Sequence, residues 1–492
     1  MGLREAIHDE AKWTKTWNGC DTLATTDSAC LDMFGRSGAM RQASVEDKEL
    51  LFSKAFREDK DIAVKLLFYT RDVRGGCGER DTFNDMFRHL AEINTESVEK
   101  NLWAVLEFGR AKDLYALVGT SAEEAMWKFM REQFELDLDN MAEGKSVSLL
   151  AKWIATPDSK VEKTKELGKL TAKKLGYTFK TMREYKTKLR ALRKYLDLPE
   201  AKMCAGKWDE IEYSKCASKF LLKNRKAFAR NDEARWNEFN KKVETGEATM
   251  NMGAVTPCDI IHHQVAHGYT KDLENMWKSL NDVCNGNALV MCDTSASMTW
   301  SKSGGMYPIE VAVALAMYFA ERNKGDLKDM FMTFDSTPKF IELNGATLKD
   351  NYNIVRTAPW GGSTNLEAAF ELLLNTCIKG KVTAEEMPDA IVIVSDMQID
   401  CVRGVDKDSN MIFYDVMKQR YAEAGYNMPQ VVFWNVNASN TTFHAAKSNR
   451  GVSLVSGYSP NVFKQVMENI GTTPYELMMA VVNSERYAEV VA

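Results

Sequence analysis

The sequence predicts an α + α/β protein, in which an N-terminal α-solenoid precedes a C-terminal doubly wound α/β domain with a parallel sheet. The chain has 492 residues, more than the roughly 250–300 at which one core stops growing. Apolar residues recur at helical spacing over 46–252. From residue 287 on, short apolar strands alternate with helices, as in a parallel sheet that is covered on both faces.

The helical block consists of short amphipathic segments separated by polar or glycine-containing breaks. We expect helices at 46–58, 61–73, 79–93, 98–110, 112–119 and 122–136, followed by basic helical segments within 148–176 and 179–198. Short helices that alternate with short turns favour stacked HEAT-like helix pairs over one compact bundle. The full division is an N-terminal segment 1–45 packed on the rest, a helical-repeat domain 46–252, a linker 253–286, an α/β domain 287–470 and a helical tail 471–492.

In the α/β domain, apolar strands are expected at 288–293, 329–334, 389–396 and 429–435. The intervening helices are expected at 309–323, 365–377, 411–425 and 461–470. Ligands of such sheets bind beyond the carboxyl ends of the strands. The loops after Cys292 and Val394 are therefore the first places to look for a site.

Positive charge is concentrated in one part of the chain. Residues 145–230 hold 23 Lys and Arg against 9 Asp and Glu, whereas the rest of the chain is acidic and the whole protein has a net charge of −5. Such a basic region can hold a polyanion. Its aromatic residues are candidates for stacking on bases: Trp153, Tyr177, Tyr185, Tyr195, Trp208, Tyr213 and Phe228. The alternative is a set of solvated, Lys-rich helix faces.

Hydroxyl and carboxylate side chains gather where the expected strands end. The first strand is followed by Asp293-x-Ser295-x-Ser297, a later loop carries 360–365 (WGGSTN), and the strand at 389–396 ends in Asp396. A hard cation such as Mg²⁺ takes about six oxygen ligands. Neutral hydroxyls would leave it under-neutralised and able to bind an outside carboxylate or phosphate. The alternatives are ordinary polar turns, or a degenerate site that holds no ion.

These motifs resemble the von Willebrand factor A family and its metal-ion-dependent adhesion site. The resemblance implies that Ser295, Ser297 and Thr364 contact Mg²⁺ or Mn²⁺ directly, and that Asp293 and Asp396 reach the ion through water. A haloacid dehalogenase would need Asp-x-Asp after the first strand, and position 295 is serine.

A wider resemblance spans about 20–480. The segments 65–87, 148–154, 213–228, 395–400, 429–435 and 451–459 are similar to the TROVE family of Ro-like proteins, especially to its uncharacterised relatives. That resemblance implies a ring of helical repeats, sealed by the A domain, that binds single-stranded ends and structured small or misfolded RNA. The residues that we expect to contact RNA are Lys152, Lys180, Arg183, Lys186, Arg190, Arg193, Lys194, Lys219, Lys223, Arg225 and Lys226.

Two other patterns are weaker evidence for a functional site. The glycine-rich segment 71–80 (RDVRGGCGER) lacks a preceding strand and a Lys-Ser/Thr pair, so it is no P-loop, and we expect Arg74 and Glu79 to brace successive repeats. The ten cysteines show no metal-ligand spacing and are predicted to be free thiols.

The sequence thus favours a non-enzymatic RNA-binding ring protein, a scaffold or quality-control adaptor with a metal site in its A domain. The alternative is a protein-interaction module that grips an acidic partner residue through the metal, including a structural or assembly role. A hydrolase is disfavoured because no general base stands out beside the ion. No apolar run reaches the about 20 residues that span a bilayer, and the N-terminus is charged. We therefore expect a cytoplasmic protein with no membrane partner.

Overall fold

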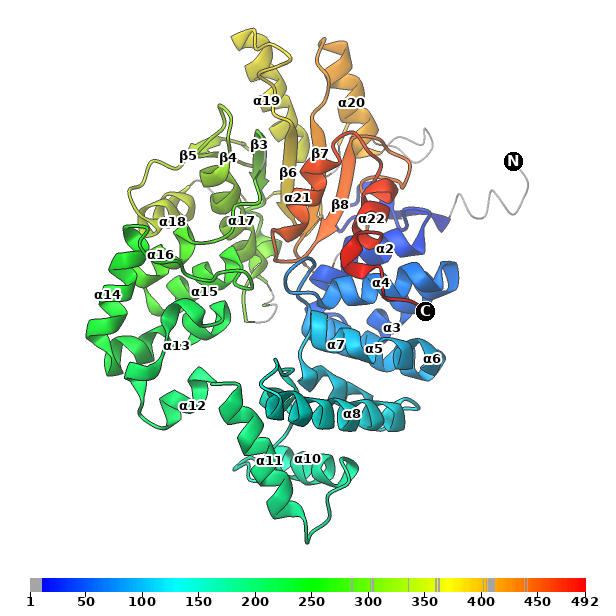
Figure 1. Ribbon diagram of the computed structural model, residues 1–492. Coiled ribbons are helices and arrows are strands. Elements are labelled where there is room, and N and C mark those ends of the chain that lie inside the picture. Colours follow the sequence, from blue (N-terminus) through cyan, green and yellow to red (C-terminus); the bar gives the residue numbers. More distant parts are fainter. Residues whose placement is uncertain are drawn as a thin grey trace.

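The protein is described by a computed structural model (Figure 1). It describes residues 11–284, 286–300, 302, 305–334, 336–358, 361, 363–400, 402–403, 405, 412–437, 439 and 441–492. Within this part of the chain, no helix is both long and apolar enough to cross a membrane. Of the predicted motif residues, Trp360, Gly362 and Cys401 lie outside the described residues.

The C-terminal half is built on a six-stranded sheet. Its strand order is β5-β4-β3-β6-β7-β8, with every neighbouring pair parallel except β4 and the edge strand β5. The strands are β3 (Ala288–Cys292), β4 (Met330–Thr333), β5 (Phe340–Glu342), β6 (Ala390–Ser395), β7 (Gln430–Asn435) and β8 (Val452–Ser456). The four predicted strands are confirmed. The sequence analysis did not identify β5 or β8 as strands.

Helices cover both faces of this sheet, as predicted for a doubly wound domain. Alternate residues of β3 and β6 point into two separate cores. Val290 and Val392 pack with the α17 side, and Met291 and Ile393 pack with the α19 and α20 side. The helices of this domain are η5 (Ala296–Thr299), α17 (Pro308–Arg322), α18 (Leu348–Thr357), α19 (Leu366–Gly380), α20 (Phe413–Glu423) and α21 (Asn461–Glu468).

The helical block begins with helices that pack in succession along the chain. They are α3 (Val45–Glu58), α4 (Lys60–Arg71), α5 (Arg80–Ile93), α6 (Thr95–Lys100), α7 (Leu102–Phe108), η2 (Ala111–Leu117) and α8 (Glu123–Ala142). The single helix predicted at 98–110 is in fact two helices, because Asn101 interrupts it and its side chain donates to the carbonyls of Ser97 and Val491. The helix expected at 112–119 is the 3₁₀ helix η2.

The basic region forms an arm that leaves this stack and then returns. The arm contains α9 (Leu150–Trp153), α10 (Glu162–Lys174), α11 (Met182–Tyr195), α12 (Pro199–Cys204), η3 (Trp208–Glu210) and η4 (Tyr213–Lys215). The returning helices are α13 (Ser218–Asn231), α14 (Glu233–Glu244), α15 (Pro257–His267) and α16 (Lys271–Lys278). The predicted linker 253–286 therefore contains two helices, and α15 packs on α17.

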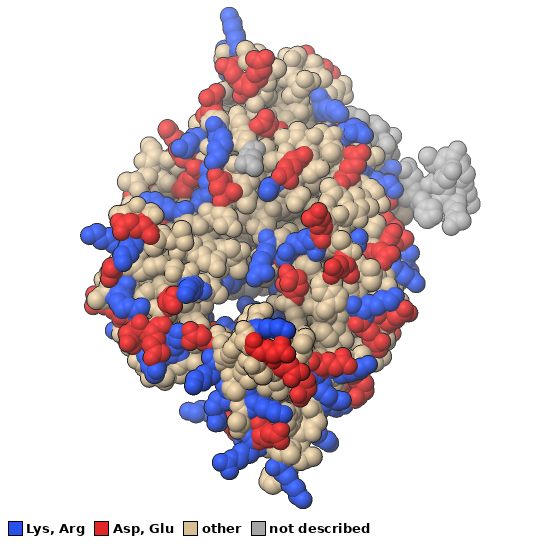
Figure 2. Space-filling model, viewed as in Figure 1, with Lys and Arg blue, Asp and Glu red and all other residues tan. Residues whose placement is uncertain are grey.

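The elements follow one another around an opening. In Figure 1 the helices α3–α8 lie on one side, α10–α12 at the bottom, α13–α16 on the other side and the sheet domain above. The space-filling view shows an opening through the molecule between the α13 side and the α7 and α8 side (Figure 2). The described structure therefore has the outline of a ring.

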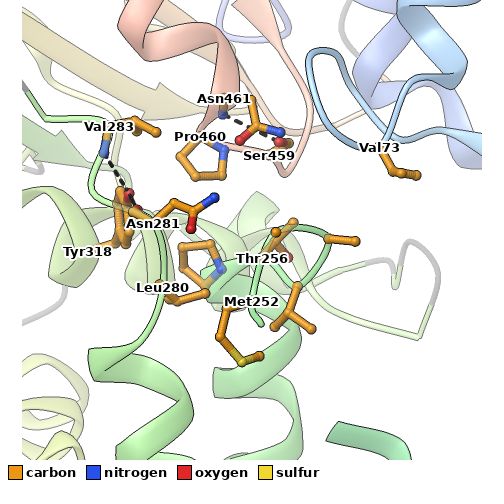
Figure 3. Close-up of a pocket in the computed structure, with 14 residues that line it drawn as sticks. Val73, Met252, Thr256, Leu280, Asn281, Val283, Tyr318, Ser459, Pro460 and Asn461 are labelled. Carbon is orange, nitrogen blue, oxygen red and sulfur yellow. Dashed lines mark hydrogen bonds between the residues drawn. The ribbon is translucent and has the colours of Figure 1, made fainter. Parts of the chain in front are cut away.

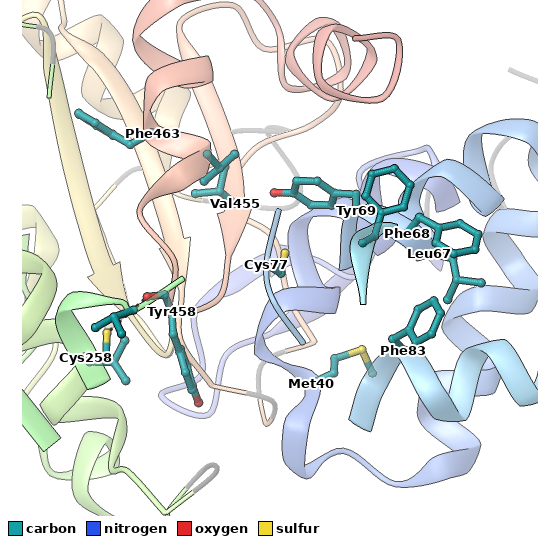
Figure 4. Close-up of a cluster of buried hydrophobic side chains, with 14 of the residues drawn as sticks. Met40, Leu67, Phe68, Tyr69, Cys77, Phe83, Cys258, Val455, Tyr458 and Phe463 are labelled. Carbon is teal, nitrogen blue, oxygen red and sulfur yellow. Dashed lines mark hydrogen bonds between the residues drawn. The ribbon is translucent and has the colours of Figure 1, made fainter. Parts of the chain in front are cut away.

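The ring closes where the N-terminal and C-terminal segments meet the sheet. The N-terminal elements are β1 (Trp13–Lys15), β2 (Asp21–Leu23), α2 (Ala29–Arg36) and η1 (Ser37–Gln42). The C-terminal elements are α22 (Pro474–Val482) and η6 (Glu485–Tyr487). Both α2 and η1 pack against β8, and α22 packs against α2 and α4. Figure 4 shows the shared core, in which Tyr69 from the helical side points toward Val455 of β8, and Tyr458 lies next to Cys258 of α15.

Polar contacts reinforce this closure. Asp72 is fully buried and accepts hydrogen bonds from the Arg486 guanidinium and from the Tyr487 hydroxyl, the latter at 3.0 Å. Glu79 binds Arg41 of η1 at 2.6 Å, and the Arg41 guanidinium lies over the Tyr458 ring. Glu79 thus ties the helical block to η1, whereas the sequence analysis expected Arg74 and Glu79 to brace successive repeats; for Arg74 the structure shows its N–H donating to Asp72 Oδ1 at 2.9 Å.

A small polar seam lies where the returning helices meet the sheet domain. Figure 3 shows Asn281, Tyr318, Ser459 and Asn461 around it. The Val283 N–H donates to the Tyr318 hydroxyl at 3.2 Å, and the Asn461 N–H donates to the Ser459 hydroxyl. The cavity encloses only about 20 Å³, so it is a packing seam between α15, α17 and α21.

Gly38 offers a test of the closure. A Cβ at this position would lie 2.4 Å from the Ser456 carbonyl oxygen of β8, and backbone cannot swing aside. We expect Gly38→Ala to lower the free energy of unfolding by about 1–3 kcal/mol, the usual cost of overpacking. Gly253→Ala is the matched control, because its Cβ would meet nothing closer than 3.6 Å. Thermal unfolding of both variants measures the difference, and equal melting temperatures would contradict this account.

Candidate functional site

The candidate metal centre lies at the carboxyl edge of the sheet. Asp293 directly follows β3, and its N–H donates to the Val394 carbonyl of β6 at 3.0 Å. Asp396 directly follows β6. Because β3 and β6 are neighbours in register, both carboxylates emerge side by side, as the sequence analysis expected. They are 0 % and 1 % exposed.

Hydrogen bonds order the loop that follows β3. The Ser295 N–H donates to Asp293 Oδ1 at 2.8 Å, which tightens the turn. The Ser295 and Ser297 hydroxyl oxygens are 3.0 Å apart. Ser395, the last residue of β6, donates from its hydroxyl to Asp293 Oδ2 and accepts from the Met397 N–H. Four of the five predicted ligands are therefore gathered: Asp293, Ser295, Ser297 and Asp396.

The fifth predicted ligand, Thr364, is held at the start of α19 by a different interaction. Its N–H donates to Asp400 Oδ2 at 3.0 Å, and the Asp400 N–H donates back to the Thr364 carbonyl at 3.1 Å. Asn18 then donates to Asp400 Oδ1 at 2.8 Å. Asp400 lies four residues beyond Asp396, so it ties the α19 loop to the β6 loop.

The electrostatics of the centre follow from burial. Burial, together with the neighbouring Asp396 carboxylate, raises the pKa of Asp293 to about 7, although hydrogen bonds from Ser395 and Ser295 oppose the shift. Burial also raises the pKa of Asp396, and a hydrogen bond from Ser297 opposes it. Two buried carboxylates this close repel one another, and a cation between them would relieve the repulsion.

The donor set fits a hard divalent cation. It is all oxygen, with hydroxyls and carboxylates, which is what Mg²⁺ and Mn²⁺ prefer. The hydroxyl oxygens of Thr294 and Ser363 are also buried at these loops without a hydrogen-bond partner. By the resemblance to the von Willebrand factor A family, Ser295, Ser297 and Thr364 would contact the ion, which stays a prediction. In the described part of the chain, no cluster of three or more His, Cys, Asp or Glu side chains is placed to hold a metal.

The N-terminal segment is hydrogen-bonded to the loop after β6, at the carboxyl edge of the sheet, which the sequence analysis did not predict. Thr16 donates to the Ile399 carbonyl at 3.0 Å, and the Trp17 N–H donates to Gln398 Oε1 at 2.8 Å. The Trp17 ring stacks on Trp300, with 6.3 Å between ring centroids. Both rings are two-thirds exposed, at 66 % and 67 %. A pair of exposed tryptophans therefore lies beside the loops that carry the predicted ligands.

Family comparisons divide the chain in two. The segments 16–141 and 125–288 match a domain of unknown function, DUF2828, and together they cover more than half of the chain. The chain belongs to the DUF2828 family. Residues 287–489 of this DUF2828 protein match a second domain of unknown function, DUF7788. The junction at 287–288 coincides with the start of β3.

Two individual proteins are similar to this DUF2828 chain. Uncharacterized protein L728 of Acanthamoeba polyphaga mimivirus is 27 % identical over 511 residues, covering 95 % of this chain and 86 % of its own length. The crystal structure of the Deinococcus radiodurans Ro (RSR) protein is 15 % identical and has a TM-score of 0.46, covering 90 % of this chain and 94 % of its own. Neither family description names TROVE proteins or a function, so that resemblance stays a prediction.

The predicted RNA contacts of the DUF2828 chain fall into two groups. Members of the first group bind other parts of the fold or are buried. Three lysines form ion pairs: Lys152 with Glu200, Lys186 with Asp158 and Lys219 with Asp259. Arg193 donates to the carbonyls of Ala151 and Ile154, and Arg225 is only 2 % exposed. The others are exposed, and no ion pair joins them to a described carboxylate: Lys180, Arg183, Arg190, Lys194, Lys223 and Lys226.

The prediction that aromatic residues of the basic region stack on bases is wrong for four of them. Tyr177, Tyr185, Tyr213 and Phe228 are less than a tenth exposed, since they pack against one another in the cores of the arm and of α13. Tyr195 is 41 % exposed and donates to the Lys145 carbonyl. Trp153 and Trp208 pack partly on the core.

The exposed aromatic residue of the arm is one that the sequence analysis passed over. Phe179 lies in the turn between α10 and α11, next to Lys180, and is 96 % exposed. Single exposed apolar side chains are common on protein surfaces, so the exposure of Phe179 shows only that its ring is accessible. Its position between two helix-forming segments was the available signal.

The candidate metal centre makes a direct prediction. Mg²⁺ or Mn²⁺ at about a hundred times its Kd should add roughly 2.7 kcal/mol to the stability of the folded chain. Ser297→Ala removes a predicted ligand and should abolish most of this gain in thermal unfolding. Ser439→Ala, an exposed serine in the loop after β7, is the control. If the metal stabilises the unmodified protein, Ser297→Ala and Ser439→Ala equally in thermal unfolding, the ion binds elsewhere.

Proposed function

We propose that this DUF2828 protein binds RNA across the arm and the rim of the opening, as a scaffold or quality-control adaptor without a catalytic step of its own. The observation that carries the proposal is the gathering of exposed cations on α11 and α13 in an otherwise acidic chain. α11 alone carries Arg183, Lys186, Lys188, Arg190, Arg193 and Lys194 against Glu184. Figure 2 shows Lys and Arg side chains along the arm and, mixed with acidic ones, at the margin of the opening.

Charge alone accounts for non-specific attraction to phosphates. Phe179 adds a second reason, because an exposed ring beside Lys180 can stack on an unpaired base while the lysine neutralises a phosphate. Bases are available for stacking in single strands, loops and ends, and they are hidden in a duplex. The proposal therefore favours RNA with single-stranded ends, including small and misfolded RNA, in agreement with the TROVE resemblance.

Charge reversal tests the RNA proposal. The variant combines Lys180→Glu, Arg183→Glu, Arg190→Glu and Lys194→Glu, which avoids Arg193 because that side chain supports α9. We expect at least a tenfold decrease in affinity for single-stranded RNA in a filter-binding assay. The slope of log affinity against log salt should also become shallower by about 0.7 for each phosphate that the variant no longer neutralises.

The control for this variant reverses four exposed lysines of the sheet domain, namely Lys339, Lys349, Lys379 and Lys464. It changes the net charge by the same amount, so the two proteins differ only in where the charge is reversed. Equal decreases in RNA affinity for the arm variant and the control variant would mean that the arm is not a specific RNA-binding surface. Absence of RNA binding by the unmodified protein at low salt would refute the proposal.

A second candidate function is favoured by the exposed Trp17–Trp300 pair. Aromatic side chains are enriched at protein interfaces, and this pair lies beside the predicted metal ligands. A partner protein could place a carboxylate on the ion and an apolar side chain on the two rings. This interaction uses a different surface from the arm, so it is compatible with RNA binding.

Chelation and mutation separate this second candidate from the first. We expect a bound partner to be released by EDTA and to be absent from the Trp300→Ala variant, while nuclease treatment leaves it bound. Affinity capture with quantitative mass spectrometry measures each case. Release by nuclease alone would show that RNA bridges the two proteins, and the metal-dependent interface would then be rejected.

A further inference from the structure

An open cavity among α13, α14 and α16 lies outside the metal centre and is not explained by packing. It has a volume of about 340 Å³, within the size range of small-molecule sites. Four cationic side chains line it, Arg225, Lys226, Lys241 and Lys271, against two carboxylates, Glu244 and Asp272. The local charge is therefore positive.

Arg225 is the central observation. It is 2 % exposed, and its Nη1 is occupied by the Leu222 carbonyl and the His263 ring. Its Nε and Nη2 are buried without a hydrogen-bond partner. These two atoms form the edge of the guanidinium that binds carboxylates and phosphates in a bidentate way. Asp272 Oδ2 lies 3.7 Å from Nε, close enough for an ion pair but beyond hydrogen-bond distance.

The other walls also favour an anion. Thr270, the N-cap of α16, lines the cavity and makes no side-chain cap hydrogen bond, while Asp272 Oδ1 in the first turn accepts from the Leu273 N–H at 3.1 Å. Lys226 and Lys241 are exposed and form no ion pair with any described carboxylate. Of the two acids, Glu244 is already paired with Lys271 at 2.8 Å.

Amide side chains complete the lining. Asn237 is exposed and offers a hydrogen-bond donor and acceptor of the kind that recognise a base edge. The Asn275 amide nitrogen, by contrast, already donates to the Asn240 carbonyl at 3.0 Å and to Asn240 Oδ1 at 3.1 Å. The cavity is larger than a bare phosphate ion requires. A guanidinium edge, two lysines and the Asn237 amide together match a phosphate attached to a nucleoside.

We propose that the cavity between α13, α14 and α16 is a nucleotide site, in which the Nε and Nη2 edge of Arg225 and the Lys241 ammonium hold the phosphate. The phosphate comes either from a free nucleotide or from the end of an RNA strand. The second source rests on the proposed function, whereas the first does not.

Calorimetric titration of the full chain with adenosine 5′-monophosphate tests the site. We expect saturable binding at one nucleotide per chain, and none with adenosine, which lacks the phosphate. Lys241→Gln and Arg225→Lys should each weaken binding at least tenfold, the second because lysine keeps the charge but has no bidentate edge. Lys242→Gln is the matched control, the next residue on α14 and outside the cavity, and should bind within twofold of the unmodified protein.

RNA oligonucleotides with and without a terminal phosphate identify the source. Tighter binding of the phosphorylated strand, abolished in Lys241→Gln, would assign the site to RNA ends. No difference between the strands, with adenosine 5′-monophosphate still bound, would assign it to a free nucleotide. Because Lys241 is exposed, its variant should fold normally even if Arg225→Lys does not.

The proposal is overturned if adenosine 5′-monophosphate shows no saturable binding, or if Lys241→Gln and Lys242→Gln bind it equally well. RNA binding that persists in that case, and still depends on the arm cations, leaves the proposed function standing. Failure to bind RNA, with nucleotide binding intact, would refute the proposed function and keep this site.

Discussion

The close approach of η1 to the end of β8 is the constraint on which the rest of the structure depends. Gly38 lies against the Ser456 backbone, where any side chain would overlap it, and the Gly38 N–H donates to the Ser456 hydroxyl at 3.0 Å. This packing joins the first helices of the chain to the last strand of the sheet. Because the helical block is attached to the sheet domain at both of its ends, the arm and the opening are held in position relative to the loops after β3 and β6.

The same closure places the N-terminal segment over the candidate metal centre. Asn18 and Asp400 connect the N-terminal turn, the loop after β6 and the start of α19 in one hydrogen-bonded series. The residues proposed to touch the ion come from separate loops, and such loops are held in place only by interactions of this kind. The basic arm has the opposite character, because it extends away from the core and exposes Lys180, Arg183, Arg190 and Lys194. We propose that the first surface holds a single ion and that the second binds a flexible polyanion.

The local features could be predicted from the sequence, whereas the long-range ones could not. Apolar runs such as Ala390–Ser395 identify buried strands, and an Asp-x-Ser-x-Ser loop after a strand needs only local geometry to gather its side chains. The pairing of Asp400 with Asn18 escaped prediction because the two are 382 positions apart in the chain. Burial of Tyr185 and exposure of Phe179 depend on which face of the arm is packed, and composition does not contain that information. Asn101 ends a helix early because it binds the distant C-terminal segment, which no local pattern records.

The central claim, that RNA lies along the arm and the rim of the opening, is tested most directly by locating the RNA on the protein. Single-stranded RNA carrying 4-thiouridine can be cross-linked to the full chain by ultraviolet light and the modified peptides identified by mass spectrometry. The account predicts cross-links within 177–195 and 218–244, the turn with Phe179, helix α11 and helices α13 and α14. Cross-links confined to the sheet domain, or spread evenly over the whole surface, would contradict it.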